Sequence, residues 1–205
     1  MLRLIDRRNL EEFPDLVRSM HRDRKRLFVD IFRWDLTHEN GEERDAFDDD
    51  DASYLVLSDN ADRHVASIRL LRTDRPHLLD TVFPELCETA IPRGPAIREI
   101  TRLCLPLRKR DRIAARNILA RGIIDYAKQA DVASYTAVCH MAFLSELLSA
   151  GWRCTPLGLP QSAGGAPAGA VEIHMSDITA GLLAVNWRCP PAAPRLSQHR
   201  PELAA

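Results

Sequence analysis

Three carboxylates lie close together in a polar, acidic and glycine-containing stretch of the chain, residues 35–51. They are Glu43, Asp45 and Asp48, and the run Asp48–Asp51 adds further negative charge. Carboxylates of this spacing suit a ligand that carries a positive charge. A solvated acidic loop on the protein surface accounts for the same composition, because charged residues are mostly exposed.

Two aromatic residues, Phe28 and Trp34, precede this loop. An aromatic face attracts a cation, so they could line the pocket of a cationic ligand or clamp a flat ring. Core packing is the alternative. It is a fair competitor for Phe28 and a weaker one for Trp34, which charged residues flank on both sides.

Charged residues also lie inside segments that read as strands. Arg69 interrupts an apolar strand, and Glu99 and Arg102 lie three apart in the strand expected over 97–105. A buried charge is costly unless it is paired, so Arg69 and Glu99 could pair across adjacent strands. Ideal alternation puts Glu99 and Arg102 on opposite faces, unless a bulge near residues 100–101 changes that. A purely structural ion network is the alternative.

The elements that must position these residues alternate between the two types of secondary structure. Helices are predicted over 10–28, capped by Asn9 or a neighbour, over 111–130, and over 140–150 with Gly151 as a left-handed cap. The predicted strands are 2–5, 54–57, 65–71, 97–105, 134–139, 152–157 and 171–175, with a turn at 59–62 and a flexible loop at 161–169.

This order predicts an α/β (α+β) three-layer sandwich around one mixed sheet. We expect one domain over residues 1–187 and a disordered tail over 188–205, where proline and alanine crowd the sequence.

Composition narrows the class of protein. The chain has 205 residues, 45% hydrophobic and 28% charged, with a net charge of −1, which gives no electrostatic case for nucleic acid or an anionic membrane as a partner. It has no apolar run near the roughly 20 residues of a membrane span, and its N-terminus does not read as a signal peptide. Five dispersed cysteines without a C-x-x-C pair predict neither a disulfide framework nor a metal site. We therefore expect a cytoplasmic protein.

Taken together, the clusters resemble the acyl-homoserine-lactone synthases, the bacterial autoinducer synthases of quorum sensing. That family's pattern runs Arg-x3-Phe-x5-Trp, Glu-x-Asp-x2-Asp, Gly/Ser-x-Arg-Leu, Phe-Pro and Glu-x-Ser/Thr-Arg. Ten elements of this pattern match in order and spacing, with Phe83-Pro84 counted as one: Arg24, Phe28, Trp34, Glu43, Asp45, Asp48, Arg69, Phe83-Pro84, Glu99 and Arg102.

The resemblance implies a fold related to the GNAT acyltransferases and a defined reaction. The amine of S-adenosylmethionine attacks an acyl thioester on acyl carrier protein, and the methionine carboxylate then closes the lactone and expels methylthioadenosine. It implies catalytic roles for Glu99, Arg69 and Arg102, with Glu99 helping to deprotonate the amine. S-adenosylmethionine, a substrate and not a cofactor, would be bound by Arg24, Phe28, Trp34, Glu43, Asp45, Asp48 and Phe83.

The acyl chain and its donor are the harder part. Thr136 matches a family threonine associated with 3-oxo chains, although a β-branched residue is favoured in any strand. Met141, Phe143 and Leu147 are candidates for the acyl tunnel, and core packing explains them equally well. A basic segment without glycine suits an acidic carrier protein better than the phosphates of coenzyme A: Arg108, Lys109, Arg110, Arg112 and Arg116.

Other classes stay open at this point. A GNAT-like N-acyltransferase that uses coenzyme A thioesters is the alternative enzyme, and a non-catalytic binding module is the alternative outside enzymes. Chain length, chain oxidation and oligomeric state are left undetermined.

Overall fold

The computed structural model describes residues 1–163 and 166–192. One eight-stranded sheet forms its centre, in the order β1-β4-β5-β6-β7-β10-β8, with β9 paired to β10. Neighbouring strands are antiparallel except β6 and β7, which are parallel. The strands are β1 (Leu2–Ile5), β4 (Ser53–Ser58), β5 (His64–Arg72), β6 (Ile97–Cys104), β7 (Ser134–His140), β8 (Arg153–Pro156), β9 (Gln161–Ala163) and β10 (Ala166–His174).

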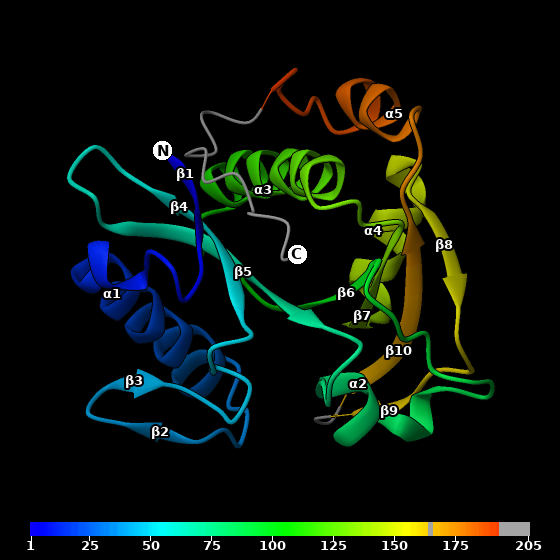
Figure 1. Ribbon diagram of the computed structural model, residues 1–205, viewed down its shortest axis with the longest axis horizontal. Helices are drawn as coiled ribbons and strands as arrows, with labels where there is room; N and C mark the ends of the chain where they lie inside the picture. Colours follow the sequence, from blue (N-terminus) through cyan, green and yellow to red (C-terminus); the bar gives the residue numbers. More distant parts are fainter. Residues whose placement is uncertain (164–165, 193–205) are drawn as a thin grey trace, which may run out of the picture.

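Helices cover both faces of this sheet, which confirms the three-layer sandwich (Figure 1). On one face lie α3, α4 and α5, and on the other lie α1, α2 and the short hairpin of β2 and β3. The elements outside the sheet are η1 (Leu10–Glu12), α1 (Pro14–Arg24), η2 (Lys25–Ile31), β2 (His38–Glu39), β3 (Glu42–Glu43), α2 (Leu78–Thr81), η3 (Pro84–Leu86), α3 (Lys109–Gln129), α4 (Met141–Ala150) and α5 (Thr179–Asn186).

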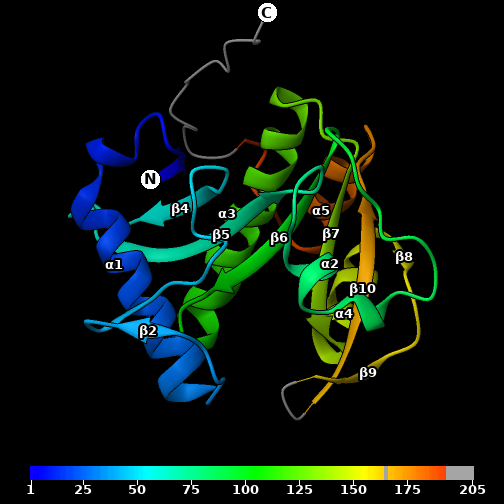
Figure 2. The same cartoon turned by 60° about the horizontal axis from the view of Figure 1, so that its bottom comes forward.

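Strand alternation explains the two cores. On β5, Ile68 and Leu70 face α3 in the larger core, whereas Leu71 packs with the apolar face of α1. Arg69 has the same parity as Leu71 and therefore lies on the α1 face. Figure 2 shows α1 and α3 on opposite sides of the sheet.

The first predicted helix proved wrong in detail. Pro14 begins α1, where a missing N–H costs nothing, so the helix starts four residues late. Asn9 does not cap it; its side chain bonds the backbone of Asp6 and Leu4 instead. After Arg24 the chain continues as a π-helix, in which the Phe32 N–H donates to the Leu27 carbonyl.

Later elements also differ from the prediction. The 35–51 loop contains the β2–β3 hairpin, β10 starts five residues before the predicted 171, and α5 was not predicted. The predicted flexible loop at 161–169 includes β9 and the start of β10, and residues 164–165 lie outside the described residues. Gly151 ends α4 at φ +92°, as predicted.

The end of the described chain packs on the α3 face, where Trp187 and Cys189 join the larger core. Residues 193–205 of the predicted tail lie outside the described residues. No helix in the described ranges combines the length and apolarity that crossing a bilayer requires.

Candidate active site

A buried network of three arginines and three carboxylates lies between α1, the β2–β3 hairpin and the sheet. Arg24, the last residue of α1, holds Asp48 through two hydrogen bonds of 2.7 and 2.8 Å, and its Nε donates to Glu43 at 2.6 Å. The side chains of Arg24, Asp48 and Glu43 are 1%, 2% and 0% exposed. A bidentate arginine–carboxylate pair fixes orientation as well as distance.

The strand arginines close the network from the sheet side. Arg69 donates hydrogen bonds to Asp45 from both terminal nitrogens, at 2.5 and 2.9 Å, and one of these nitrogens lies 3.0 Å from Asp48. Arg102 donates to Glu43 at 3.1 Å and to Asp45 at 2.7 Å. Three positive and three negative charges therefore neutralise one another, which is the condition for burying them.

The charge states follow from this geometry. Burial by itself would raise the pKa of Asp48, but the hydrogen bonds and charges of Arg24 and Arg69 outweigh it and hold that pKa well below its usual range. The pKa of Asp45 is lowered by Arg69 and Arg102 in the same way, against the effect of burial. Both carboxylates are thus ionised and engaged with arginine, and they are less free to meet a cationic ligand than the sequence suggested. Asp45 is the more accessible, with a side chain 17% exposed.

Two uncharged side chains, one on α1 and one on β4, also hold the acidic loop in place. His21 on α1 contacts the Glu43 carbonyl through Nδ1 at 2.9 Å, and the Tyr54 hydroxyl donates to Asp48 at 2.8 Å. Burial and the charge of Arg24 lower the pKa of His21 to about 4, so its ring is neutral near pH 7 and Nδ1–H is the donor. This explains how a glycine-bearing loop holds three charges in place.

Two aromatic residues flank the network on the π-helix side. The rings of Phe28 and Trp34 stack with centroids 5.0 Å apart and planes at 6°, and the Arg102 guanidinium lies 5.9 Å from the Phe28 ring. Phe28 is buried, whereas Trp34 is partly exposed. Single-turn π segments are frequent at functional sites because they turn one side chain out of the regular helical register. Both sequence-predicted aromatics therefore lie beside the charged residues.

Arg102 reaches this site because the strand is irregular there. Ser67 pairs with Cys104 but Arg69 pairs with Thr101, so β6 carries an extra residue, and Arg102 itself has φ +49°. The predicted bulge exists, slightly after residues 100–101. The predicted Arg69–Glu99 pair is wrong: Arg69 bonds Asp45, Asp48 and the Thr101 hydroxyl.

Glu99 occupies a separate, less polar place on the same sheet face. Its Oε2 accepts the Leu79 N–H of α2 at 3.2 Å, its Oε1 is buried without a partner, and the residue is 0% exposed. Burial raises the pKa of Glu99 to about 7, against the backbone N–H groups of Leu79 and Leu78 and the charge of Arg69. A carboxyl group with that pKa exchanges its proton near neutral pH, as a general base must. Thr136 is its register partner on β7, and its hydroxyl is also buried and unbonded.

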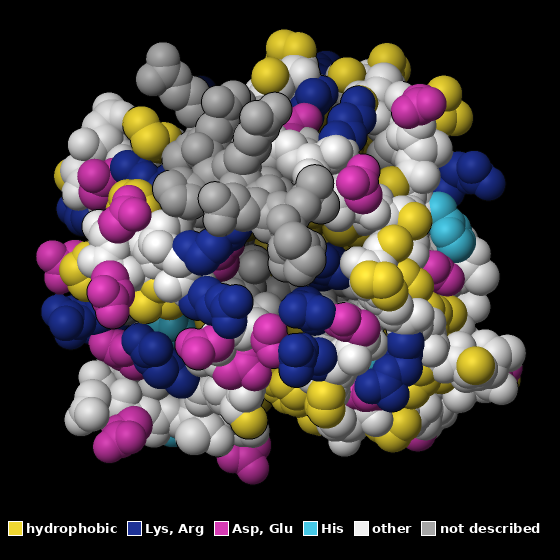
Figure 3. Space-filling view, viewed as in Figure 1, with side chains coloured by type: hydrophobic (Ala, Val, Ile, Leu, Met, Phe, Trp, Pro, Cys, Tyr) yellow, Lys and Arg dark blue, Asp and Glu magenta, His cyan; other side chains and the backbone are white. Residues whose placement is uncertain are grey.

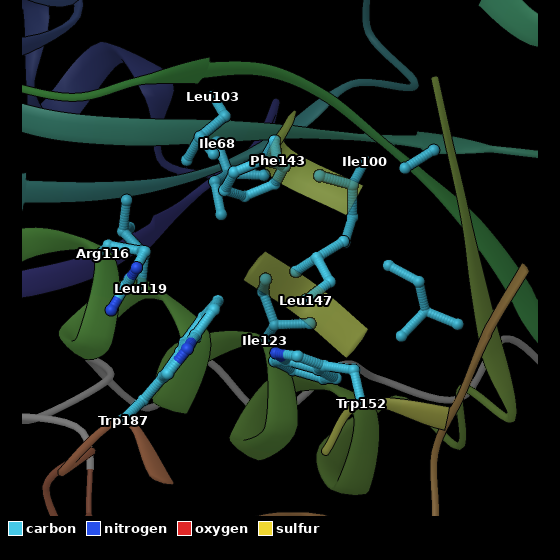
Figure 4. A pocket seen from close by; sticks show the side chains of 13 residues that line it. Ile68, Ile100, Leu103, Arg116, Leu119, Ile123, Phe143, Leu147, Trp152 and Trp187 are labelled. Atoms are coloured by element: carbon cyan, nitrogen blue, oxygen red, sulfur yellow. The ribbon is translucent and has the colours of Figure 1, made fainter. Parts of the chain in front are cut away.

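An apolar cavity lies on the opposite face of the sheet, under α3 and α4 (Figure 4). Its apolar walls come from β5, β6 and β7 on the sheet and from α3 and α4 above it. The parallel pairing of β6 and β7 ends at Ile100 and Ala137, and both line the cavity. The cavity therefore meets the sheet where these two strands part.

The candidates for the acyl tunnel separate in the structure. Phe143 and Leu147 line the cavity, whereas Met141 packs beside the larger core and is not among the lining residues. Thr136 lies on the Glu99 face, because its neighbours Tyr135 and Ala137 point toward α3. Phe83 packs in a third apolar cluster with Leu79 and Leu86, beside α2 and away from the aromatic stack.

The predicted docking residues also divide. The first four lie exposed around the start of α3, namely Arg108, Lys109, Arg110 and Arg112. Arg116 is largely buried: its guanidinium stacks 3.8 Å from the Trp187 ring, bonds Glu146 and lines the cavity. It is a cavity residue and not an exposed docking residue.

The sequence motifs did not include Trp152 and Trp187, which lie in the cavity wall. They also did not include His140, which lies on the α1 face of the sheet together with Glu99 and the ion network; we call this face the active face. The ring of His140 lies 6.1 Å from that of Trp34, and its Nδ1 is buried without a partner. Strand parity could have found His140, because it lies two and four residues after Val138 and Thr136 on the same face of β7.

The fold and this site define a GNAT-like acyltransferase. A solved structure described as a putative N-acetyltransferase from Lactobacillus plantarum has the same fold at a TM-score of 0.53 and 16% identity, and the match covers 85% of this chain and 99% of that one. Much closer is a solved coenzyme A-dependent acyl-homoserine lactone synthase, BjaI, in complex with SAM and isopentyl-CoA. It has a TM-score of 0.86 and 28% identity over 96% of this chain and 95% of its own.

The sequence comparisons give the family. Residues 8–181 match the model of the autoinducer synthases. An acyl-homoserine-lactone synthase from Rhizobium radiobacter is 30% identical over 156 residues, which are 72% of this chain and 73% of that protein. The chain belongs to the autoinducer synthase family and is an acyl-homoserine-lactone synthase, which confirms the resemblance seen in its motifs.

Proposed function

We propose that this enzyme joins the acyl group of a thioester to the amine of S-adenosylmethionine and releases methylthioadenosine as the lactone closes. The observation that carries the proposal is Glu99, a buried carboxyl group with a pKa of about 7 and a free oxygen on the active face. The amine of S-adenosylmethionine must lose a proton to attack a thioester, and a base with a pKa near 7 combines ionisation with proton affinity.

Some of the remaining site residues contact the substrate, and the others hold those residues in position. The stacked pair of Phe28 and Trp34 offers an aromatic face for the adenine or sulfonium. Asp45 is the accessible acid of the network and the best partner for positive charge, and Arg102 has the most exposed side chain of the three network arginines, at 8%. Arg24, Arg69, Glu43 and Asp48 act mainly by holding these groups in place. Phe83 packs in the apolar cluster that contains Leu79, the residue whose N–H bonds Glu99.

We assign the acyl chain to the apolar cavity behind the sheet because its lining is apolar and includes Phe143 and Leu147. A chain attached near Glu99 would pass between β6 and β7 where their pairing ends, and its apolar tail would meet Ile68, Phe143 and Leu147. The Thr136 hydroxyl lies before that opening, where it could donate to a 3-oxo group.

We predict that Ala137→Leu shortens the preferred acyl chain. The added atoms enter the cavity beside the opening, so the ratio of kcat/KM for long over short donors should fall about tenfold, the effect of about 1.4 kcal/mol. The matched control is Ala115→Leu, which overpacks the same core without lining the cavity. An unchanged ratio in Ala137→Leu would place the acyl chain elsewhere.

Two donors are compatible with the site. The exposed cations at the start of α3 favour acyl carrier protein, whose acidic surface they complement. The similarity to the coenzyme A-dependent BjaI favours acyl-coenzyme A as the second candidate. Figure 3 shows positive and negative side chains interleaved over the described part of one face, and the protein has a net charge of −1, so docking has to be local.

One experiment tests both the reaction and its donor. The enzyme is incubated with S-adenosylmethionine and one acyl chain, carried either by acyl carrier protein or by coenzyme A, and lactone and methylthioadenosine are measured. We expect both products, with the carrier protein preferred. Reversal of Arg108, Lys109, Arg110 and Arg112 to glutamate should raise the KM for the carrier protein about tenfold or more. Salt should mimic this effect by screening, and the KM for S-adenosylmethionine should stay constant.

The outcomes separate the possibilities. A wide preference for acyl-coenzyme A would overturn the carrier-protein donor and leave the synthase reaction standing. If neither methylthioadenosine nor lactone forms with either donor, the proposed reaction itself is wrong.

A further inference from the structure

His140 is a second unpartnered titratable group on the active face. Among the described residues, five buried side-chain polar atoms lack a hydrogen-bond partner, and Glu99 Oε1, Thr136 Oγ1 and His140 Nδ1 are three of them. Thr136 and His140 share one face of β7, and Glu99 lies opposite Thr136 on β6. A buried polar atom without a partner costs about 1–3 kcal/mol, so three on one face indicate where a polar substrate supplies the missing bonds.

Topology tells which part of the substrate passes His140. The strands β6 and β7 are parallel, so their carboxyl ends lie at the same edge of the sheet, and ligands of such sheets bind at that edge. His140 ends β7, and the exposed cations of α3 follow β6. β6 pairs with β7 only as far as Ala137, so the last residues of β7 face the opening between the strands. Suppose that a donor docks at the start of α3 and brings its carbonyl group beside Glu99. The part of the donor that carries the thiol then lies along this edge of the sheet.

We propose that His140 is the general acid that protonates the leaving thiol. The proposal rests on the synthase reaction proposed above. As the nitrogen lone pair forms the C–N bond, Glu99 takes a proton from the amine and the C–S electron pair goes to sulfur. Protonated His140 gives its Nδ1 proton to that sulfur, so that a neutral thiol leaves. Water then carries the proton from Glu99 back to the imidazole, and the products are one amide and one thiol.

The structural alternative is that His140 only packs on Trp34 and precedes α4. Its side chain makes no capping hydrogen bond to that helix, so packing on Trp34 is the structural contribution to be controlled for. A test must therefore separate proton donation from packing. Asparagine is suitable, because its amide nitrogen occupies the place of Nδ1 and can donate a hydrogen bond but cannot give up a proton.

The experiment compares two thioesters of one acyl chain, one with an alkyl thiol and one with an acidic aryl thiol that leaves without a proton. We expect His140→Asn to lose about 100-fold in kcat on the alkyl thioester and less than about threefold on the aryl thioester. The KM for S-adenosylmethionine should change little. His140→Gln serves as the second variant if the first one unfolds, and thermal melting checks both.

Equal losses on the two thioesters, or near-normal turnover of the alkyl thioester, would overturn the role of His140. A wild-type enzyme that makes no lactone from either thioester or from a natural donor would instead overturn the proposed synthase reaction. A purely structural role would slow both thioesters equally. If His140 donates a proton, the rate of His140→Asn should rise more steeply with the acidity of the leaving thiol than the rate of the wild type does.

Discussion

Glu99→Gln is expected to abolish lactone synthesis while the protein stays folded. Glutamine keeps the shape of the side chain and can still accept the Leu79 N–H, but it cannot take a proton from the amine. The rate should fall at least about 100-fold in kcat, the usual contribution of a general base. In the wild type, kcat should rise with pH through about 7 as Glu99 ionises. The measurement is methylthioadenosine release between pH 5 and 9.

The control is Glu172→Gln, which neutralises a carboxylate on β10 next to Thr136 that accepts a hydrogen bond from the Ser134 hydroxyl. It should retain most of the rate. Stability gives an independent readout. The folded-state pKa of Glu99 is raised, so the native state holds this proton more tightly than the unfolded chain does, and wild-type stability should fall as pH rises from about 4.5 to about 7. Glu99→Gln should remove that part of the slope. A variant with near-normal turnover would exclude Glu99 as the base.

Arg24→Met is expected to cost about 3–5 kcal/mol of unfolding free energy, because it leaves Asp48 and Glu43 buried with too little positive charge. Combining it with Asp48→Leu removes both members of the bidentate pair, and the double variant should lose clearly less than the sum of the two single losses. Denaturant unfolding of the four proteins measures this coupling.

The matched control is the exposed pair of Arg63 and Asp59, whose side chains are 77% and 32% exposed. Arg63→Met should change stability by less than about 1 kcal/mol. A similarly small loss for Arg24→Met would mean that the buried network is hydrated and not a structural unit.

Sequence reasoning placed most of the sheet because strands such as β4, β5 and β6 carry their own pattern of apolar residues between turns. It failed where tertiary contacts decide. The helix α5 spans only eight residues, includes Gly181, and depends on Leu183, which is fully buried. Its local sequence has little helical amphipathicity to find. Pro14 offered a visible start for α1, but the apolar pattern continued before it and concealed the break.

For the site, the motif spacing identified the charged residues but not their pairing. Arg69 and Glu99 are on neighbouring strands, and only the position of the acidic loop explains why Arg69 turns to Asp45. Arg116 looked like part of a basic run, yet Trp187, 71 positions away in the chain, stacks on it. Such long-range choices leave no local pattern. His140 differs, since strand parity already put it on the active face.

The ion network also affects how the chain must fold. Its members come from α1, the acidic loop, β5 and β6, and Arg102 and Glu43 meet across 59 residues of sequence. Any partly folded state that buries some of these charges without their partners bears the cost of desolvation and gains little of the attraction. The N-terminal helix, the hairpin and the middle of the sheet are thereby made to order together, and local opening near Arg24 becomes expensive unless the whole cluster opens. A binding loop that would otherwise fray is in this way tied to the cooperative unfolding of the sheet.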